Sequence, residues 1–457
     1  MKDLTKGCPA KVILLFAIPL ILGNIFQQLY NMADSKIVSL YVGTGALAAV
    51  GATGVISNMI TGFMNGLTQG FAILIARCFG AKDEKRMRQY VAGTILLTSV
   101  FGIGFTVISE LTISGLLQVL QTPQDIFYEA ESYIRIVLIG CIFSSIYNVC
   151  ANMLRAIGDS KRPLYCLCVA IFLNIALDIV FVKGLSMGIQ GAAYATVVSQ
   201  GVAALLVGVY MLSKYGTILP RKKDWKLETG QYGQLLSSGL AMALMNCIVS
   251  IGTVVLQSSI NGLGTKIVAA HTAGRRVFDI LMIMIYTVGF AMTTYVSQNM
   301  GAMRVDRVKQ GVRHAMAIVT VITTVVISVC FLVGDDMVRW LASTTDPEIL
   351  KAAVMYIQVG VVFFYVLGPL FVLRCSLQGM GRKLIPVCSS ILEMILKILS
   401  VQILVPRLQY FGVALTEPIS WIAMTILLAG AYLHHPPKAI EEERRERDVS
   451  ENVCKDY

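Results

Sequence analysis

The sequence predicts an all-α integral membrane protein with twelve transmembrane helices in two parallel six-helix repeats. Three observations support this fold class. The 457 residues are 56% hydrophobic and only 14% charged, whereas a soluble globular protein carries about 25% charged residues. Twelve apolar runs are long enough to cross a bilayer. Short motifs in the first half of the chain recur in the second half.

The apolar runs define the expected helices. The first run lacks a small-residue cleavage site, so we interpret it as a transmembrane segment rather than a signal peptide. The twelve runs begin near Val12, Ala46, Tyr90, Tyr133, Pro163, Gly191, Leu236, Ile267, Ala315, Ala352, Ile385 and Gly412.

The linkers between the runs alternate in charge. Each linker after an even-numbered run is basic, for example "RCFGAKDEKRMR" and "PRKKDWK", whereas the intervening linkers are short or lean acidic. Because cytoplasmic loops carry excess Lys and Arg, this pattern places both termini in the cytoplasm. The net charge of +11 therefore orients a multi-pass protein of the cell membrane, and it does not indicate a nucleic-acid partner.

Two units of six runs occur in the same orientation. "GTGALAAVGATG" from Gly43 matches "GTKIVAAHTAG" from Gly264, and "GAAYATVVS" matches "GVALTEPIS", both 221 residues apart. Pro163 matches Pro386 at an offset of 223. We expect an N-lobe, a cytoplasmic inter-lobe loop, a C-lobe and a cytoplasmic tail, over residues 1–212, 213–234, 235–433 and 434–457.

Two carboxylates and several polar groups lie inside apolar runs of the first half. Asp34 is late in the first run and Asp178 late in the fifth, so both are expected in the outer half of the membrane. Asn174 lies one helical turn before Asp178, on the same face. Thr196 opens the sixth run, and Asn148 lies near the inner end of the fourth. Two carboxylates close together favour holding a cation, so the set suits a proton or sodium site.

Each acid also has a simpler explanation as a helix-end charge beside a lysine, Lys36 or Lys183. Their agreement in depth favours the ion site. The repeat places Val255 opposite Asp34, so the acidic pair belongs to the first half alone. This asymmetry indicates a function, because packing alone would tolerate the same residue in both copies.

The second half has charges of its own within apolar runs. Glu393 and Lys397 are four residues apart in the eleventh run, and Glu417 opens the twelfth. We interpret them as a buried ion pair that stabilises helix packing. A second coupling element or a substrate-binding element is the alternative. Arg275 and Asp279, also four residues apart, are expected to form a similar pair.

Several functional classes lack support in the sequence. It contains no Walker A motif, no Gly-rich nucleotide fingerprint and no HExxH motif. The four histidines do not cluster within the apolar runs, so we expect no enzyme. Cys166 and Cys168 have no matching His or Cys cluster, so we expect no metal site there. A receptor or scaffold would not explain the duplication with its unshared acidic pair.

Four segments of the first half resemble the multidrug and toxic compound extrusion (MATE) transporters, and the bacterial DinF-like branch is the most similar. They are "IPLILGNIFQQLYNMADSKIV", "LRAIGDSKRPLY", "LNIALDIVF" and "GIQGAAYATVVSQ". The similarity runs from about Val12 to about Tyr432. It implies two six-helix lobes around a central cavity. It also implies export of cationic or amphipathic small molecules by antiport with H⁺ or Na⁺, with no cofactor.

The resemblance also suggests roles for residues. Asp34 and Asp178 match the N-lobe acids that carry coupling in the DinF-like branch. The polar positions that match the surrounding set are Tyr30, Asn174 and Thr196, with Asn148 a looser match. The NorM-like branch carries acids on its seventh and tenth spans, and the interiors of those spans have none here. We expect a monomer, and a lipid-linked precursor flippase of a related fold is the alternative function.

Overall fold

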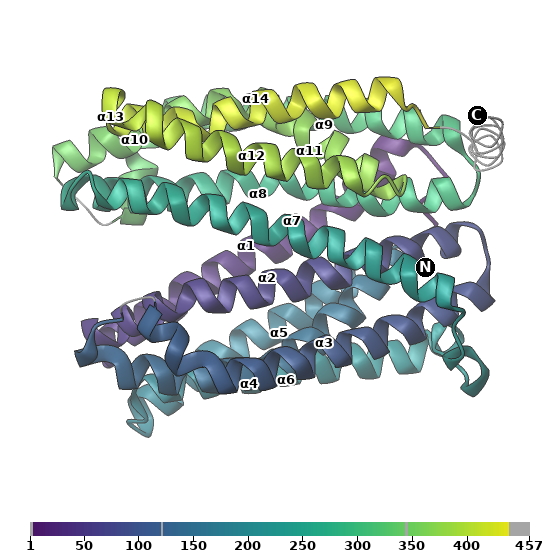
Figure 1. Cartoon of the computed structure of the whole chain (residues 1–457), viewed down its shortest axis with the longest axis horizontal. Coiled ribbons are helices and arrows are strands. Elements are labelled where there is room, and N and C mark those ends of the chain that lie inside the picture. The colour runs from purple at the N-terminus through teal and green to yellow at the C-terminus, as the bar shows by residue number, and fades with distance from the viewer. Residues whose placement is uncertain (1–2, 120–121, 343–345, 438–457) are drawn as a thin grey trace, which may run out of the picture. The chain divides into compact units, whose positions relative to one another are not determined.

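The protein is helical throughout the part of the chain that its computed structural model describes, residues 3–119, 122–342 and 346–437, with no β-strand in those ranges. The predicted tail lies almost wholly outside these residues. The helices, shown in Figure 1, are α1 (Pro9–Tyr41), α2 (Thr44–Gly80), α3 (Glu84–Val119), α4 (Gln124–Ala156), α5 (Lys161–Asp178), η1 (Ile179–Gly184), α6 (Gly188–Lys214), η2 (Gly216–Ile218), η3 (Lys222–Trp225), α7 (Thr229–Asn261), α8 (Thr265–Gly301), α9 (Val305–Ala342), α10 (Pro347–Val362), α11 (Phe364–Gly379), α12 (Leu384–Ile403), α13 (Val405–Leu408) and α14 (Tyr410–His434).

The helices account for the predicted transmembrane segments. Eleven of the described helices are long and apolar enough to cross a membrane. The pair α10 and α11, which is bent by 52°, makes a twelfth span when it is counted as one. The all-α membrane fold is therefore confirmed, with eleven or twelve candidate spans among the described residues. Pro369 lies inside α11 and, lacking an N–H, leaves a carbonyl of the preceding turn without its helical partner.

The backbone repeats along with the sequence. Residues with a positive backbone φ angle recur at the same offsets as the sequence motifs, so both copies of the six-helix unit turn at equivalent places. Gly158 and Gly381 have the same φ of +86°, a value that glycine adopts without steric cost. The matched pairs are Gly43 and Gly264, Lys82 and Met303, Gly158 and Gly381, and Gly188 and Gln409.

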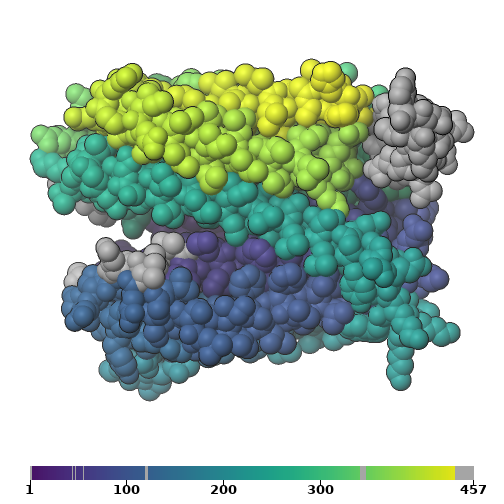
Figure 2. Space-filling model, viewed as in Figure 1, coloured from purple at the N-terminus to yellow at the C-terminus, as the bar shows by residue number. Residues whose placement is uncertain are grey.

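The chain packs as two compact units. The N-unit comprises Ile18–Ile75 and Glu84–Cys247. The C-unit comprises residues 3–17, 76–83 and the described residues from Ile248 onward. The first helix of each repeat, α1 or α7, therefore contributes residues to both units. Within the C-unit, α12 packs along α14, and Figure 2 shows their side chains adjacent on one face.

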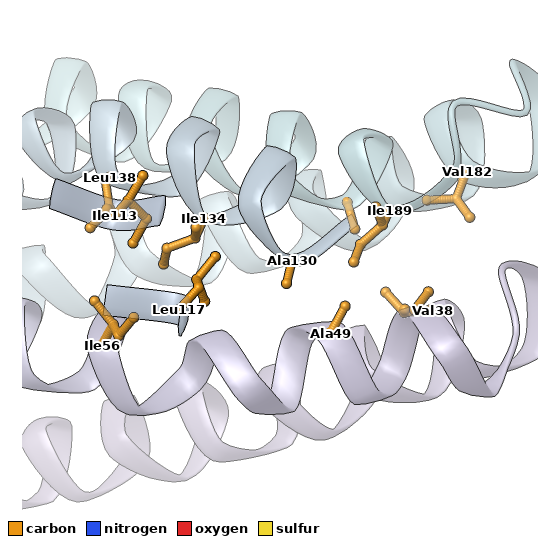
Figure 3. Packing of buried hydrophobic residues seen from close by; sticks show 12 residues of the cluster. Val38, Ala49, Ile56, Ile113, Leu117, Ala130, Ile134, Leu138, Val182 and Ile189 are labelled. Atoms are coloured by element: carbon orange, nitrogen blue, oxygen red, sulfur yellow. The ribbon is translucent and has the colours of Figure 1, made fainter. Parts of the chain in front are cut away.

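The N-unit core lies next to both acids that the sequence singled out. Val38 and Val182 each follow an acid, Asp34 or Asp178, by one helical turn, and both are buried in a single apolar cluster. Ile134 of α4 is fully buried in the same cluster, whose side chains converge in Figure 3. Burial of one face of α1 and one face of the segment after α5 therefore orients the two carboxylates.

The segment 76–83 packs against its own repeat counterpart within the C-unit. A Cβ atom on Gly80 would lie 1.9 Å from the carbonyl oxygen of Gln298. A Cβ atom on Gly301 would lie 1.9 Å from the carbonyl oxygen of Arg77. The offset of 221 relates Gly80 to Gly301 and Arg77 to Gln298, so the contact is reciprocal. Only glycine permits two helix ends to approach this closely.

Candidate functional site

The two N-unit acids meet. Asp34 of α1 and Asp178, the last residue of α5, have their carboxyl groups in hydrogen-bonding contact. Asp178 has no exposed surface. The Oδ1 atom of each carboxyl group is buried and has no hydrogen-bond partner among the described groups. Asp178 is thus buried and Asp34 half-buried, and one oxygen of each carboxyl group remains able to accept a hydrogen bond.

Neighbouring polar groups join the pair into one cluster. With the Asn174 amide oriented to satisfy both of its neighbours, its nitrogen donates to Asp178 Oδ2 at 2.9 Å. Its oxygen accepts from the Thr196 backbone N–H at 3.1 Å. The Tyr30 hydroxyl lies 3.3 Å from Thr196 Oγ1. The structure thereby brings together five of the six predicted N-lobe residues, from α1, α5 and α6.

The backbone changes its hydrogen-bonding pattern directly after Asp178. The segment η1 is a π-helix, and the Leu185 N–H bonds to the Val180 carbonyl at 2.8 Å, five residues back. Such wide turns occur frequently at functional sites. Asp178 therefore stands at a junction between two helical forms, which the apolar sequence "IVFVKG" did not indicate.

The helix-end explanation of the acids does not match the geometry. Among the described residues, no ion pair joins Asp34 to Lys36 or Asp178 to Lys183. Lys36 is exposed, and the Lys183 ammonium instead lies 5.3 Å from the centre of the Tyr41 ring. The acids therefore face each other rather than the lysines beside them.

One predicted residue is separate from the cluster, and one unpredicted residue is close to it. The part of the chain that the structure describes shows no hydrogen bond from Asn148 to the cluster. Tyr133 of α4 was not predicted, yet it lies near both Asp34 and Asp178. Its only signal in the sequence is that Tyr356 matches it at the offset of 223.

The C-unit contains a larger network of charges. Lys397 Nζ lies 2.9 Å from Glu393 Oε1 on the same helix, and Arg275 Nε lies 2.8 Å from Asp279 Oδ1. Glu417 joins these two pairs, since its Oε1 atom accepts from Arg275 Nη1 at 2.8 Å and lies 3.9 Å from Lys397 Nζ. The sequence suggested two separate pairs, and the structure shows one network across α8, α12 and α14.

The network continues at both ends. His271 Nδ1 lies 3.4 Å from the Tyr410 hydroxyl, and the Arg275 guanidinium donates to the Tyr356 hydroxyl at 3.3 Å. At the other end, Arg374 of α11 lies near Glu393 and donates to Ser390 Oγ. Among the described residues, no group of three or more His, Cys, Asp or Glu side chains could hold a metal ion.

Comparison with known proteins supports the resemblance seen in the sequence. The MatE family model matches residues 19–180 and 241–401, one segment in each repeat. The "Probable multidrug resistance protein YpnP" of Bacillus subtilis is 28% identical over 84% of this chain and 85% of its own length. The "FAD transporter" of Shewanella oneidensis is 24% identical over 93% of this chain and 95% of its own.

Solved structures agree with the fold. One, described as the outward-facing conformation of a multidrug resistance MATE family transporter of the MOP superfamily, superposes with a TM-score of 0.87 at 25% identity. It covers 93% of this chain and 96% of the other. The family match spans most of the sequence, and the helices and both repeats agree with it. The chain therefore belongs to the MatE family of membrane transporters, which are not enzymes.

Proposed function

We propose that the protein is a secondary active multidrug exporter that moves cationic or amphipathic small molecules by antiport with protons. Asp34 and Asp178 form the proton-coupling site, and Asn174, Thr196 and Tyr30 position them. The basic even-numbered linkers support a cell-membrane protein with both termini in the cytoplasm. We propose that it works as a monomer of the DinF-like branch, because each unit contains all the side chains of its own polar network.

The hydrogen-bonding contact between the two acids is the observation that carries this proposal. Two carboxylates in contact, remote from any paired base, are stabilised when they share a proton. Loss of that proton leaves two like charges, which at about 4 Å and an effective dielectric constant of about 20 repel by about 4 kcal/mol. If this repulsion acts in one conformation and is relieved in the other, the ratio of their populations changes by roughly a thousandfold. That change is enough to drive a transport cycle.

The surrounding groups favour a proton over sodium. A hard metal cation requires several oxygen ligands. The Asn174 oxygen already accepts from the Thr196 backbone, and the Thr196 and Tyr30 hydroxyls contact each other. The carboxylate oxygens are therefore the main acceptors left, a set that suits one proton better than a coordinated metal ion.

The names of the relatives bear on the substrate. YpnP is named as a probable multidrug resistance protein, and the Shewanella oneidensis protein as an FAD transporter. The uncompensated acids of the N-unit favour cationic cargo in this protein. A lipid-linked precursor flippase would need a cationic site for phosphates, and the acid pair does not favour it.

Transport in proteoliposomes tests the proposal. We expect efflux of a cationic dye to follow an imposed pH gradient and to ignore a sodium gradient of equal size. Asp34→Asn and Asp178→Asn should each lower the pH-driven rate at least tenfold with normal protein yield. Asp125→Asn, at an exposed acid in the first turn of α4, is the matched control and should transport normally. Unchanged rates in both site variants contradict the assignment, and a sodium-driven flux contradicts proton coupling.

A further inference from the structure

The C-unit network occupies the place that the repeat assigns to the N-unit site. The offset of 223 aligns Lys397 with Asn174, and the offset of 221 aligns Glu417 with Thr196. In the N-unit, the Asn174 amide lies 3.5 Å from the Thr196 hydroxyl. In the C-unit, Lys397 Nζ lies 3.9 Å from Glu417 Oε1. The same contact between repeat-equivalent helices is therefore neutral in one copy and ionic in the other.

A tyrosine extends the correspondence. Tyr133 lies near the two N-unit acids, and its counterpart Tyr356 contacts Arg275 of the C-unit network. The N-unit acids themselves have no counterpart, because Val255 stands opposite Asp34. One copy of the duplicated site thus carries acids that lack a fixed cation, and the other carries acids together with a lysine.

The Lys397 side chain is buried between two carboxylates. Lys397 is only 3% exposed, and its ammonium lies between Glu393 at 2.9 Å and Glu417 at 3.9 Å. From α7, the backbone of Gly252 covers the aliphatic stem, and a Cβ atom added there would lie 3.1 Å from Lys397 Cδ. The ammonium is consequently held where a free cation would bind between the two carboxylates.

The charges around Lys397 balance only while it is present. Three acids and three bases alternate through the network across α8, α11, α12 and α14. They are Asp279, Arg275, Glu417, Lys397, Glu393 and Arg374. Removal of the Lys397 side chain leaves a single uncompensated negative charge in a buried site, which is costly. A monovalent cation would restore neutrality.

We propose that the Lys397 ammonium is a built-in cation that occupies the C-unit counterpart of the N-unit ion site. Truncation of this side chain opens a site for a small alkylammonium ion, which takes the place of the lysine ammonium between Glu393 and Glu417. Lys397 thereby restricts coupling to the N-unit and sets the number of ions moved per cycle. The statement on coupling rests on the proposed function, whereas the binding site does not.

Thermal unfolding of the purified full-length protein tests the site without any transport measurement. Wild type and Lys397→Ala are compared in choline, sodium and ethylammonium chlorides at constant ionic strength. The same comparison is made for both proteins carrying Asp34→Asn and Asp178→Asn, which remove the acids of the N-unit site. Lys397→Ala should gain a saturable rise in Tm of at least roughly 2 °C with ethylammonium over choline, and a smaller one with sodium. Wild type should not.

Matched variants locate the effect. Lys266→Ala removes an exposed lysine that pairs with Glu348 and should show no cation response. Lys397→Ala combined with Glu417→Gln restores charge balance and should lose the response. An equal response in wild type and Lys397→Ala overturns the proposal, and so does a response that survives in the double variant.

The proposal stays testable if Lys397→Ala folds poorly. Extraction and purification with ethylammonium in place of choline should then recover monodisperse protein. Recovery supports the built-in cation, because a free ammonium ion replaces the tethered one. Failure to recover, with the charge-balanced double variant folded normally, overturns it. Dye transport by Lys397→Ala separately reports on the N-unit mechanism.

Discussion

The reciprocal glycine contact between residues 76–83 and 297–304 makes a quantitative prediction for Gly80→Ala. The new Cβ atom would lie 1.9 Å from the Gln298 carbonyl oxygen and 2.7 Å from its carbonyl carbon. Ordinary van der Waals contact begins at 3.4 Å, so the two backbones must separate by about 1.5 Å. No side-chain rotation can relieve the overlap, because every contacting atom belongs to the backbone.

The cost follows from this geometry. Overpacking of a close-packed region costs about 1–3 kcal/mol, and a backbone clash belongs at the upper end. A loss of about 3 kcal/mol corresponds to a fall in Tm of roughly 5 °C or more. Gly301→Ala should lose a similar amount, because its Cβ atom would meet the Arg77 carbonyl oxygen at the same 1.9 Å.

Thermal unfolding in detergent, followed by intrinsic fluorescence, measures the loss. Gly54→Ala on α2 is the matched control, since a Cβ atom there has nothing within 4 Å and alanine favours a helix by up to about 1 kcal/mol. The reasoning is refuted if Gly80→Ala and Gly301→Ala unfold within 1 °C of that control, a margin well below the roughly 5 °C expected.

Three further predictions address the core, the C-unit network and the N-unit cluster. Ile134→Ala, at a fully buried position of the apolar cluster, should lower the free energy of unfolding by about 2–5 kcal/mol in denaturant titration. Glu417→Gln should cost about 3 kcal/mol, because it removes one of the two carboxylates that lie 2.8 Å from Arg275 and leaves the buried network with an uncompensated positive charge; an unchanged Tm speaks against the network. Tyr30→Phe removes one hydroxyl contact of 3.3 Å and about 1 kcal/mol. The dye efflux rate should therefore stay within roughly fivefold of wild type, unlike that of Asp178→Asn.

The sequence was sufficient to predict the fold and much of the N-unit cluster. Hydropathy and the alternating linkers define the spans, because the bilayer imposes length and charge rules on every segment. Asn174 and Asp178 share a helix face by spacing alone, and the Asn174 amide lies 2.9 Å from Asp178 Oδ2. Depth counting set Asp34 level with Asp178, and the two carboxyl groups are in contact.

Other features depend on packing between helices, which no periodicity encodes. Tyr133 approaches the acids only because α4 contacts α6 and presents that face. Glu417 joins two ion pairs from three helices, a link that requires their rotations to be known. The break between α10 and α11 interrupts an apolar run that hydropathy alone represents as continuous. Local spacing predicts neighbours along one helix, and it cannot predict neighbours across several.

The division of α1 and α7 between the two units has a consequence for the duplicated chain. The start of α1 belongs to the C-unit, and α7 as far as Cys247 belongs to the N-unit. Cleavage in the linker around 213–234 would leave each fragment without a helical piece that completes its core. The two fragments should therefore be unstable when expressed alone and should reassemble when co-expressed. The two repeats of the duplicated chain should therefore depend on each other for folding, although each carries its own six-helix unit.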